Sequence, residues 1–271
     1  MAHKNKQNYS PYKARLEKAG LTPQKKILAS PHAQPRAFKP ETVFSPGEAN
    51  DRLADIFRNH HFKCSHQERQ KLAEFYHLLM KNQEHQNFTR LLKIKDIAIK
   101  HFIDSLIITE MVQIQFPLID VGTGPGFPGI PLKIRYPNEK ILLGEGVQKR
   151  VEFLKQVREK LDLKNLDIIG RNINPYFVYP VQSVITRAVE DITNTLRNVM
   201  SCLQEGGCVY FMKGPGVDPE IQMAAHEMSE YFKLEKDLAY DIPNTTNKRR
   251  LVVYRKIKNA PLPEDPDEEV E

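Results

Sequence analysis

The stretch from Leu118 to Leu132 constrains the fold of this chain more than any other segment. It reads LIDVGTGPGFPGIPL, so a short apolar run ends in the acid Asp120, and four glycines follow within eight residues. Glycine takes backbone angles that a side chain would forbid, and it lets the backbone approach a ligand closely. A strand that runs into such a loop predicts an α/β fold in which the loop holds a ligand against bare backbone.

Two classes of ligand fit this loop. Residues 124–129 match G-x-G-x-x-G, the dinucleotide-binding pattern. Residues 120–126 match D-x-G-x-G-x-G, the loop of S-adenosylmethionine methyltransferases. A carboxylate at Asp120 would repel a pyrophosphate but attract the ammonium group of S-adenosyl-L-methionine. We therefore predict a cofactor loop for S-adenosyl-L-methionine, formed with Asp120, Gly122, Gly124 and Gly126. A nicotinamide-dependent oxidoreductase is the alternative.

The pattern that surrounds the loop predicts a mostly parallel sheet with helices on both faces, because strands alternate with helices from residue 117 onward. The last two strands are joined by a short link, which favours an antiparallel hairpin and hence the Rossmann-like sheet of class I methyltransferases. Strands are expected at 117–121, 140–145, 166–170, 181–188, 206–214, 236–242 and 249–256, and helices at 128–135, 149–161, 192–204 and 218–231.

Four segments are expected along the chain. Residues 1–50 are rich in proline and hold nine Lys or Arg against three Glu, which predicts a disordered basic arm. Residues 51–116 show apolar side chains at helical spacing without a glycine, which predicts an N-terminal helical cap. Residues 117–257 form the predicted S-adenosylmethionine-binding methyltransferase domain, and residues 258–271 form an acidic tail.

Composition limits the classes of partner. The net charge is +6, and a basic body with a basic arm indicates a polyanion such as RNA. No apolar run approaches the ~18 residues that a membrane span needs, and the N-terminus has no apolar signal region. The three cysteines form no metal-binding pattern. We expect a cytoplasmic monomer that binds neither a metal ion nor a membrane.

Candidate binding residues lie at the ends of the predicted strands, at the edge where a ligand would bind. Glu145 ends the second strand, where a carboxylate can accept hydrogen bonds from ribose hydroxyls. Asn172 and Ile173 follow the third strand, where their backbone groups could serve an adenine edge. Arg187 ends the fourth strand, where the transferred methyl group would lie. Arginine stays protonated, so Arg187 suits positioning and charge and not proton transfer.

Further basic residues lie near the ends of the last strands. Lys213, Lys248, Arg249 and Arg250 could hold phosphates beside the cleft. The alternative is that these four residues are ordinary surface cations in contact with solvent.

Taken together, these segments resemble the RsmG family, also called GidB, from about residue 55 to 257. The order and the spacing of the matching segments make the resemblance specific. They are NFTRL (87–91), KHFIDSL (100–106), IDVGTGPGFPGIPL, EGVQKRVEFLKQV, VITRAV, FMKG and RRLVVYRK.

The resemblance implies an S-adenosylmethionine-dependent enzyme that methylates N7 of a guanine in 16S ribosomal RNA, alone or in the small ribosomal subunit. It places Gly122 and Phe127 in the cofactor pocket and Glu145 at the position of a common Asp. It also implies that Arg171, Arg187 and Arg249 surround the cofactor and the target guanine, so that Arg187 and Arg249 are the catalytic candidates. RNA contacts are expected from Arg171, Lys213, Lys248 and Arg250. The pairs Lys100–His101 and Asp104–Ser105 are expected to join the cap to the sheet.

Three features depart from the family pattern. Ile173 stands where the family usually has Glu, TRAVED replaces the commoner SRAF type of segment, and residues 1–50 match nothing in the family. A non-catalytic RNA- or ribosome-binding relative is therefore a second hypothesis. A methyltransferase with another substrate is a third.

Overall fold

The computed structural model describes residues 39–40, 42–187 and 189–261. Most of the predicted arm and the predicted tail beyond residue 261 lie outside the described residues. The helix α2 spans Pro46–Asn59, so it begins within the last residues of the predicted arm. The helix begins at Ser45, which forms a capping box with Glu48. This start signal satisfies two backbone N–H groups that the first turn leaves unpaired.

The predicted cap region contains two long helices followed by a chain of short ones. Helix α3 spans His66–Gln86 and also starts with a capping box, between Ser65 and Glu68. The short helices run without a break along KHFIDSL. They are α4 (Ile94–Ile97), the π-helix η1 (Ala98–Ile103), α5 (Asp104–Leu106) and the 3-10 helix η2 (Ile107–Glu110). No helix in the described part of the chain is long and apolar enough to cross a bilayer.

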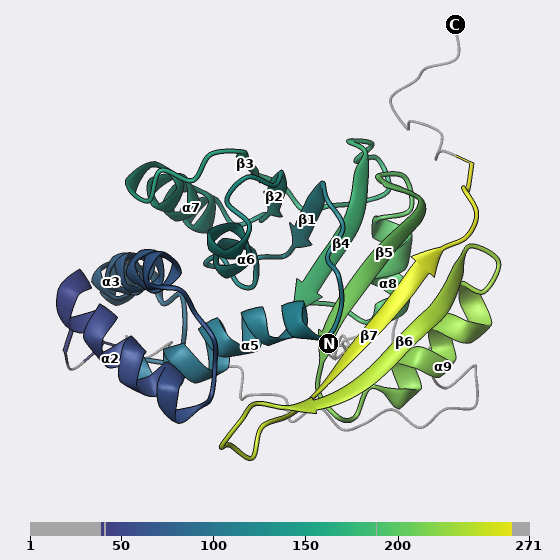
Figure 1. Cartoon of the computed structure of the whole chain (residues 1–271). Coiled ribbons are helices and arrows are strands. Elements are labelled where there is room, and N and C mark those ends of the chain that lie inside the picture. The colour runs from purple at the N-terminus through teal and green to yellow at the C-terminus, as the bar shows by residue number, and fades with distance from the viewer. Residues whose placement is uncertain (1–38, 41, 188, 262–271) are drawn as a thin grey trace, which may run out of the picture.

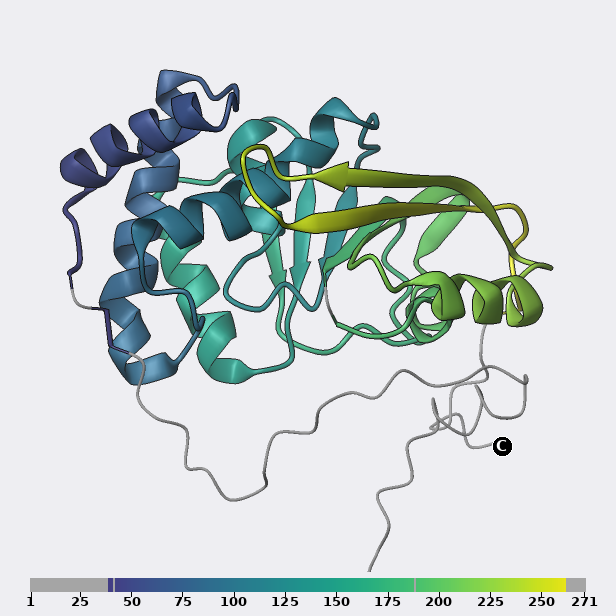
Figure 2. The ribbon, with the colours of Figure 1, turned by 90° about the horizontal axis from the view of Figure 1, so that it is seen from below.

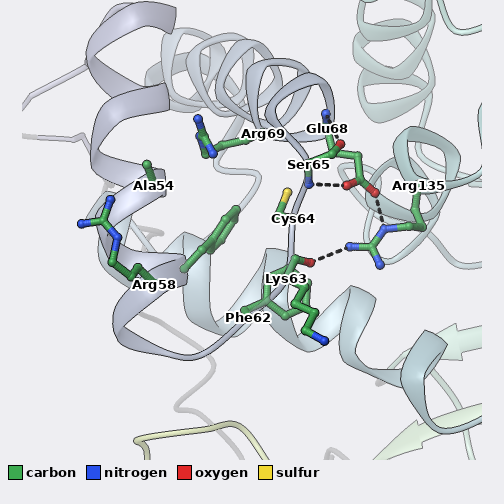
Figure 3. Close-up of a pocket in the computed structure, with 10 residues that line it drawn as sticks. Ala54, Arg58, Phe62, Lys63, Cys64, Ser65, Glu68, Arg69 and Arg135 are labelled. Carbon is green, nitrogen blue, oxygen red and sulfur yellow. Dashed lines mark hydrogen bonds and ion pairs between the residues drawn. The ribbon is translucent and has the colours of Figure 1, made fainter.

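A hollow of about 680 Å³ opens among α2, α3 and the end of helix α6 (Gly129–Arg135), as Figure 3 shows. Three of the cations that line it, Arg58, Arg69 and Arg135, have partners within the protein. Arg135 pairs with Glu68 and donates to the Lys63 carbonyl, and Arg69 donates to Asn50. This hollow lies beside the cap helices and not at the glycine loop.

Seven strands form one sheet in the order β3-β2-β1-β4-β5-β7-β6, with β7 antiparallel to both of its neighbours. The predicted fold class is therefore confirmed (Figure 1). The strands are β1 (Leu118–Val121), β2 (Ile141–Gly144), β3 (Leu166–Ile169), β4 (Val181–Arg187), β5 (Leu203–Lys213), β6 (Phe232–Asp241) and β7 (Lys248–Lys256). The helices that follow strands are α6 (Gly129–Arg135), α7 (Gln148–Lys160), α8 (Ile192–Asn198) and α9 (Asp218–Glu227).

Four predicted boundaries are wrong by three or more residues. Helix α8 ends at Asn198 and not at 204, because β5 already begins at Leu203. Strand β5 therefore begins before the predicted residue 206, and the residues between Leu203 and Cys208 form a bulge within the strand. Helix α9 ends at Glu227, and the edge strand β6 begins at Phe232, before the predicted residue 236. Most of the side chains added at this end of β6 are exposed, so they lack the apolar alternation that predicts a strand.

The sheet separates two apolar cores, because successive side chains of a strand point to opposite faces. Leu118 of β1 belongs to the core that also contains the cap, α6 and α7. Ile119 belongs to the core that contains α8 and α9. Figures 1 and 2 show the cap beside α6 and α7, with α9 at the opposite end of the molecule. We call these the cap face and the α9 face of the sheet.

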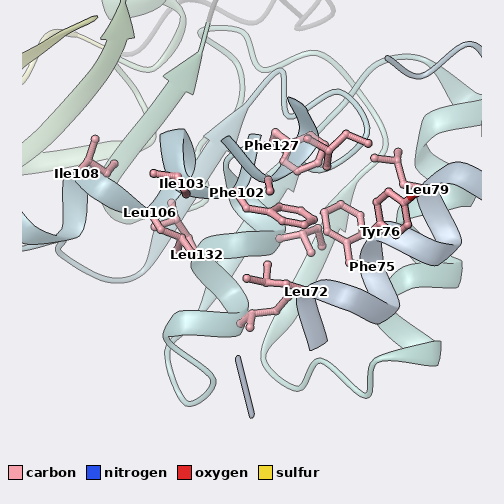
Figure 4. Close-up of a cluster of buried hydrophobic side chains, with 14 of the residues drawn as sticks. Leu72, Phe75, Tyr76, Leu79, Phe102, Ile103, Leu106, Ile108, Phe127 and Leu132 are labelled. Carbon is pink, nitrogen blue, oxygen red and sulfur yellow. The ribbon is translucent and has the colours of Figure 1, made fainter. Parts of the chain in front are cut away.

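An aromatic cluster joins the cap to the glycine loop. The ring centroid of Phe75 in α3 lies 5.1 Å from that of Phe127 in the loop and 6.1 Å from that of Phe102 in η1. Figure 4 shows these side chains converging from the three segments. The loop is therefore held from the cap side by apolar packing, in addition to its own hydrogen bonds.

Candidate active site

The candidate site lies where the strand order reverses, between β1 and β4. These two strands are parallel neighbours, with Asp120 opposite Ile185. Their carboxyl ends lead into two loops that touch, because a Cβ added to Gly122 would lie 2.6 Å from Val189. In sheets of this kind the crevice outside the strand ends is the usual place for a ligand.

Glycine is required by the backbone of the loop. Gly122, Gly124 and Gly126 have φ angles of 70°, 62° and 110°, which side chains rarely adopt. Gly126 is also closed in, since an added Cβ would meet Ile130 at 2.6 Å. Gly124 differs, because nothing lies within 4 Å of its added Cβ. This stretch of bare backbone faces open space and fits a ligand that binds against it.

The Asp120 carboxylate holds the glycine loop through two hydrogen bonds. Its Oδ2 accepts hydrogen bonds from the Thr123 hydroxyl at 2.5 Å and from the Gly129 N–H at 2.7 Å. The residue is fully buried, and its Oδ1 has no partner among the described residues. Burial raises the pKa of Asp120 to about 7. The unpaired Oδ1 fits a site that a cationic ligand group would complete.

Glu145 is held at the end of β2 by its own neighbours. One of its oxygens accepts from the Val147 N–H at 2.8 Å, and the other lies 3.5 Å from an Arg150 nitrogen. A carboxylate has about four acceptor positions, so hydroxyl groups of a ligand could still be accepted. Two exposed valines follow strand ends at this edge, Val147 after β2 and Val189 after β4.

The residues after β3 divide between surface and core. Asn172 is exposed and lies over Gly146. The side chain of Ile173 is buried in the α9-face core and packs on Gly144. Only backbone groups of Ile173 could therefore meet a ligand, as the sequence analysis expected.

Arg187 lies inside the junction between the cap and the sheet. One guanidinium nitrogen donates to the Lys100 carbonyl and to Asp104, both at 3.2 Å, and the other lies 3.0 Å from His101 Nδ1. The guanidinium also lies 5.5 Å from the centre of the Phe127 ring. Burial lowers the pKa of Arg187, and Asp104 opposes this shift. The side chain is therefore fixed in one pose at the end of β4.

Asp104 connects Arg187 to the second catalytic candidate. Its other oxygen accepts from Arg249 Nε at 3.2 Å, so one carboxylate of the cap bridges two arginines of the sheet. Tyr240 is the direct partner of Arg249 in the β6–β7 pairing. Its hydroxyl is buried and has no partner among the described residues.

The four predicted RNA-binding residues do not form one group. Met212 and Leu251 belong to the cap-face core, so the next residue in β5 and the preceding residue in β7 point to the α9 face. These are Lys213 and Arg250, which also lie opposite each other. Both are engaged, Lys213 with Glu220 and the Glu190 carbonyl, and Arg250 with Asp218 and Asp237. By contrast, Arg171 and Lys248 are exposed.

Three members of the site were not singled out from the sequence. Thr89 belongs to the NFTRL segment, and its hydroxyl lies 3.1 Å from His101 Nε2. The other two are Tyr240, in the edge strand β6, and Val189, in the loop after β4. His101 and Asp104 were expected to join the cap to the sheet, but their contacts with Arg187 were not predicted. The three-residue spacing of His101 and Asp104 on a helix is the one signal that could have placed both on the same face.

The sheet order, the open glycine loop and the arginines at its edge define the class of S-adenosylmethionine-dependent methyltransferases. The family described as rRNA small subunit methyltransferase G (GidB) matches residues 68–252. This chain belongs to that family, as the sequence analysis predicted. Among the described residues no group of three or more His, Cys, Asp or Glu could hold a metal ion.

Curated relatives support the same assignment. A ribosomal RNA small subunit methyltransferase G 2 of Bdellovibrio bacteriovorus is 68% identical over 86% of this chain and 92% of its own length. A protein of the same name from Syntrophobacter fumaroxidans is 37% identical over 80% of this chain, which spans 43% of that relative. A ribosomal RNA small subunit methyltransferase G of Carboxydothermus hydrogenoformans is 34% identical over 71% of this chain and 85% of its own length.

The raised pKa of Asp120 predicts a pH-dependent stability. Its folded-state pKa of about 7 exceeds the ordinary value of 3.8, so the folded protein binds this proton more tightly than the unfolded chain does. Its contribution is fully present below pH ~4 and is lost as the pH rises through about 7. Relative to Asp120→Asn, the wild type should lose free energy of unfolding over this range in urea titrations. If the difference in the free energy of unfolding between the two proteins stays constant with pH, the raised pKa of Asp120 is contradicted.

Proposed function

We propose that this chain transfers the methyl group of S-adenosyl-L-methionine to N7 of a guanine in small-subunit (16S) ribosomal RNA. Membership of the rRNA methyltransferase family supports the reaction class. The observation that carries the cofactor assignment is the bare backbone at Gly124, which faces open space at the switch point of the sheet. We further propose that the protein acts in the cytoplasm as a monomer.

The cofactor would be held by groups at three strand ends. Asp120 Oδ1, which has no partner within the described residues, would meet the ammonium group of the methionine moiety. The backbone from Gly122 to Gly126 would pass beneath the cofactor, and Glu145 would accept from its ribose hydroxyls. Backbone groups of Asn172 and Ile173 would meet the adenine. When bound, the cofactor supplies an electrophilic methyl group on its sulfonium.

Phe127 has a supporting role in this scheme. The family resemblance implies that Phe127 lines the cofactor pocket. The residue is 4% exposed, and its ring packs against Phe75, Phe102 and His101. We propose that it shapes the pocket by holding the loop against the cap.

The acceptor chemistry needs no general base from the protein. Guanine N7 is a hydrogen-bond acceptor with a free lone pair and no proton to lose. The imidazole beside Arg187, that of His101, is half-buried, and both of its nitrogens have partners. Catalysis then rests on orientation, and holding two reactants in a near-attack pose can lower a barrier by roughly 7–11 kcal/mol. We propose that Arg187 and Arg249 orient the target base.

RNA would reach the site across the exposed cations. Arg171 follows β3 and Lys248 begins β7, so they lie on separate parts of the strand-end edge. We propose that both contact phosphates. Lys213 and Arg250 are left out of this proposal, because their charges are engaged by carboxylates on the α9 face.

The cofactor site can be tested with a pair of matched glycine variants. Gly124 and Gly206 both have positive φ, and neither has an atom within 4 Å of an added Cβ. Both Gly→Val changes should therefore cost a similar backbone strain of about 1–3 kcal/mol. Only Gly124→Val should abolish binding of S-adenosyl-L-methionine in calorimetric titrations. Equal binding by both variants would remove the glycine loop from the cofactor site.

The RNA contacts can be tested through salt dependence. Each phosphate contact contributes about one unit to the slope of log affinity against log salt concentration. Arg171→Ala and Lys248→Ala should each lower the slope for a small-subunit rRNA fragment by about one unit. Lys233→Ala, an exposed lysine on β6, is the control and should leave the slope unchanged. An affinity that does not vary with salt would contradict the proposed contacts.

A further inference from the structure

His101 touches two different parts of the candidate site. Its ring lies nearly parallel to that of Phe127, with centroids 4.2 Å apart and planes inclined by 14°. Its Nδ1 lies 3.0 Å from a guanidinium nitrogen of Arg187. One residue of the π-helical turn η1 therefore contacts both the glycine loop after β1 and the arginine at the end of β4. Such turns occur frequently at functional sites.

The partners of His101 determine where its proton lies. A guanidinium can only donate, so Nδ1 must be the acceptor in the contact with Arg187. The proton of the neutral ring is then on Nε2, which lies 3.1 Å from the Thr89 hydroxyl oxygen. Burial and the charge of Arg187 lower the pKa of His101 to about 3, so the ring stays neutral at physiological pH.

The contact with Thr89 ties this ring to the long cap helix α3. Gln83 in α3 donates to the Thr89 carbonyl at 2.7 Å and accepts from the Thr89 N–H at 3.0 Å. The hydroxyl oxygen of Thr89 also accepts a hydrogen bond from the Leu91 N–H at 3.0 Å. A continuous series of hydrogen bonds therefore runs from α3 through Thr89 and His101 to Arg187.

We propose that His101 is a positioning residue for methyl transfer, acting as a neutral hydrogen-bond acceptor that fixes the pose of the Arg187 guanidinium. This inference rests on the proposed function. His101 holds one of the two terminal nitrogens of Arg187, and Lys100 and Asp104 hold the other. Without the His101 acceptor the guanidinium keeps its charge but loses its fixed orientation.

Two substitutions separate the acceptor from the ring. His101→Phe keeps an aromatic ring against Phe127 but removes the acceptor. His101→Asn places a carbonyl oxygen near the position of Nδ1 but removes the ring. If the acceptor matters, the order of turnover must differ from the order of thermal stability.

The experiment measures kcat, the dissociation constant of S-adenosyl-L-methionine and the unfolding midpoint of each variant, with small-subunit rRNA as the acceptor. His101→Phe should lower kcat about 10- to 100-fold, as a small misplacement of a catalytic group does, with less than about threefold change in cofactor affinity. His101→Asn should retain more of kcat than His101→Phe while unfolding at a lower temperature. If kcat instead follows stability, so that Phe is the more active variant, His101 only packs and the inference is overturned.

Two controls keep this result separate from the proposed function itself. His77 is a half-buried cap histidine whose Nδ1 lies 2.9 Å from the Phe44 carbonyl, so His77→Phe and His77→Asn should both leave kcat unchanged. Nitrogen NMR of the wild-type imidazoles should show His101 as the neutral Nε2–H form at pH 5, and an imidazolium or Nδ1–H form would overturn the inference. Wild-type protein that binds the cofactor but methylates no small-subunit rRNA would instead contradict the proposed function.

Discussion

The arrangement of the site depends on one buried carboxylate, Asp104. It accepts from Arg187 of β4 through one oxygen and from Arg249 of β7 through the other, both at 3.2 Å. Asp104 belongs to the cap, so this bridge joins the cap to strands β4 and β7, which are far apart in the chain. Removing one partner of a buried ion pair typically costs about 3–5 kcal/mol, because a charge is left without compensation. The positions of the cap and of both arginines are therefore coupled.

The alternation of side chains along the strands separates the charges that belong to the site from those that do not. Arg249 and Arg250 are adjacent in sequence, yet they point to opposite faces of the sheet. Arg249 meets Asp104 on the cap face, whereas Arg250 meets Asp218 and Asp237 on the α9 face. The bridge on the cap face leaves one guanidinium charge in excess of its carboxylate.

The sequence was sufficient to predict the sheet, because apolar runs, turn residues and a short last link each report a local property. It also predicted the glycine loop, whose pattern follows from positive φ angles at Gly122, Gly124 and Gly126. It could not predict that Lys213 and Arg250 are engaged by acids, since pairing between distant strands depends on register. Nor could it predict the contacts with Phe75 and His101 that bury Phe127 beneath the cap. Long-range contacts of this kind leave no short-range pattern.

The most direct test of this account is transfer of a labelled methyl group from S-adenosyl-L-methionine to small-subunit rRNA by the wild type and by Asp104→Asn. The substitution keeps the shape of the side chain but removes the charge that holds Arg187 and Arg249 together. The account predicts label at N7 of a guanine with the wild type. It also predicts a large loss of transfer in the variant, with cofactor binding retained. Absence of label with the wild type, or equal transfer by both proteins, would contradict it.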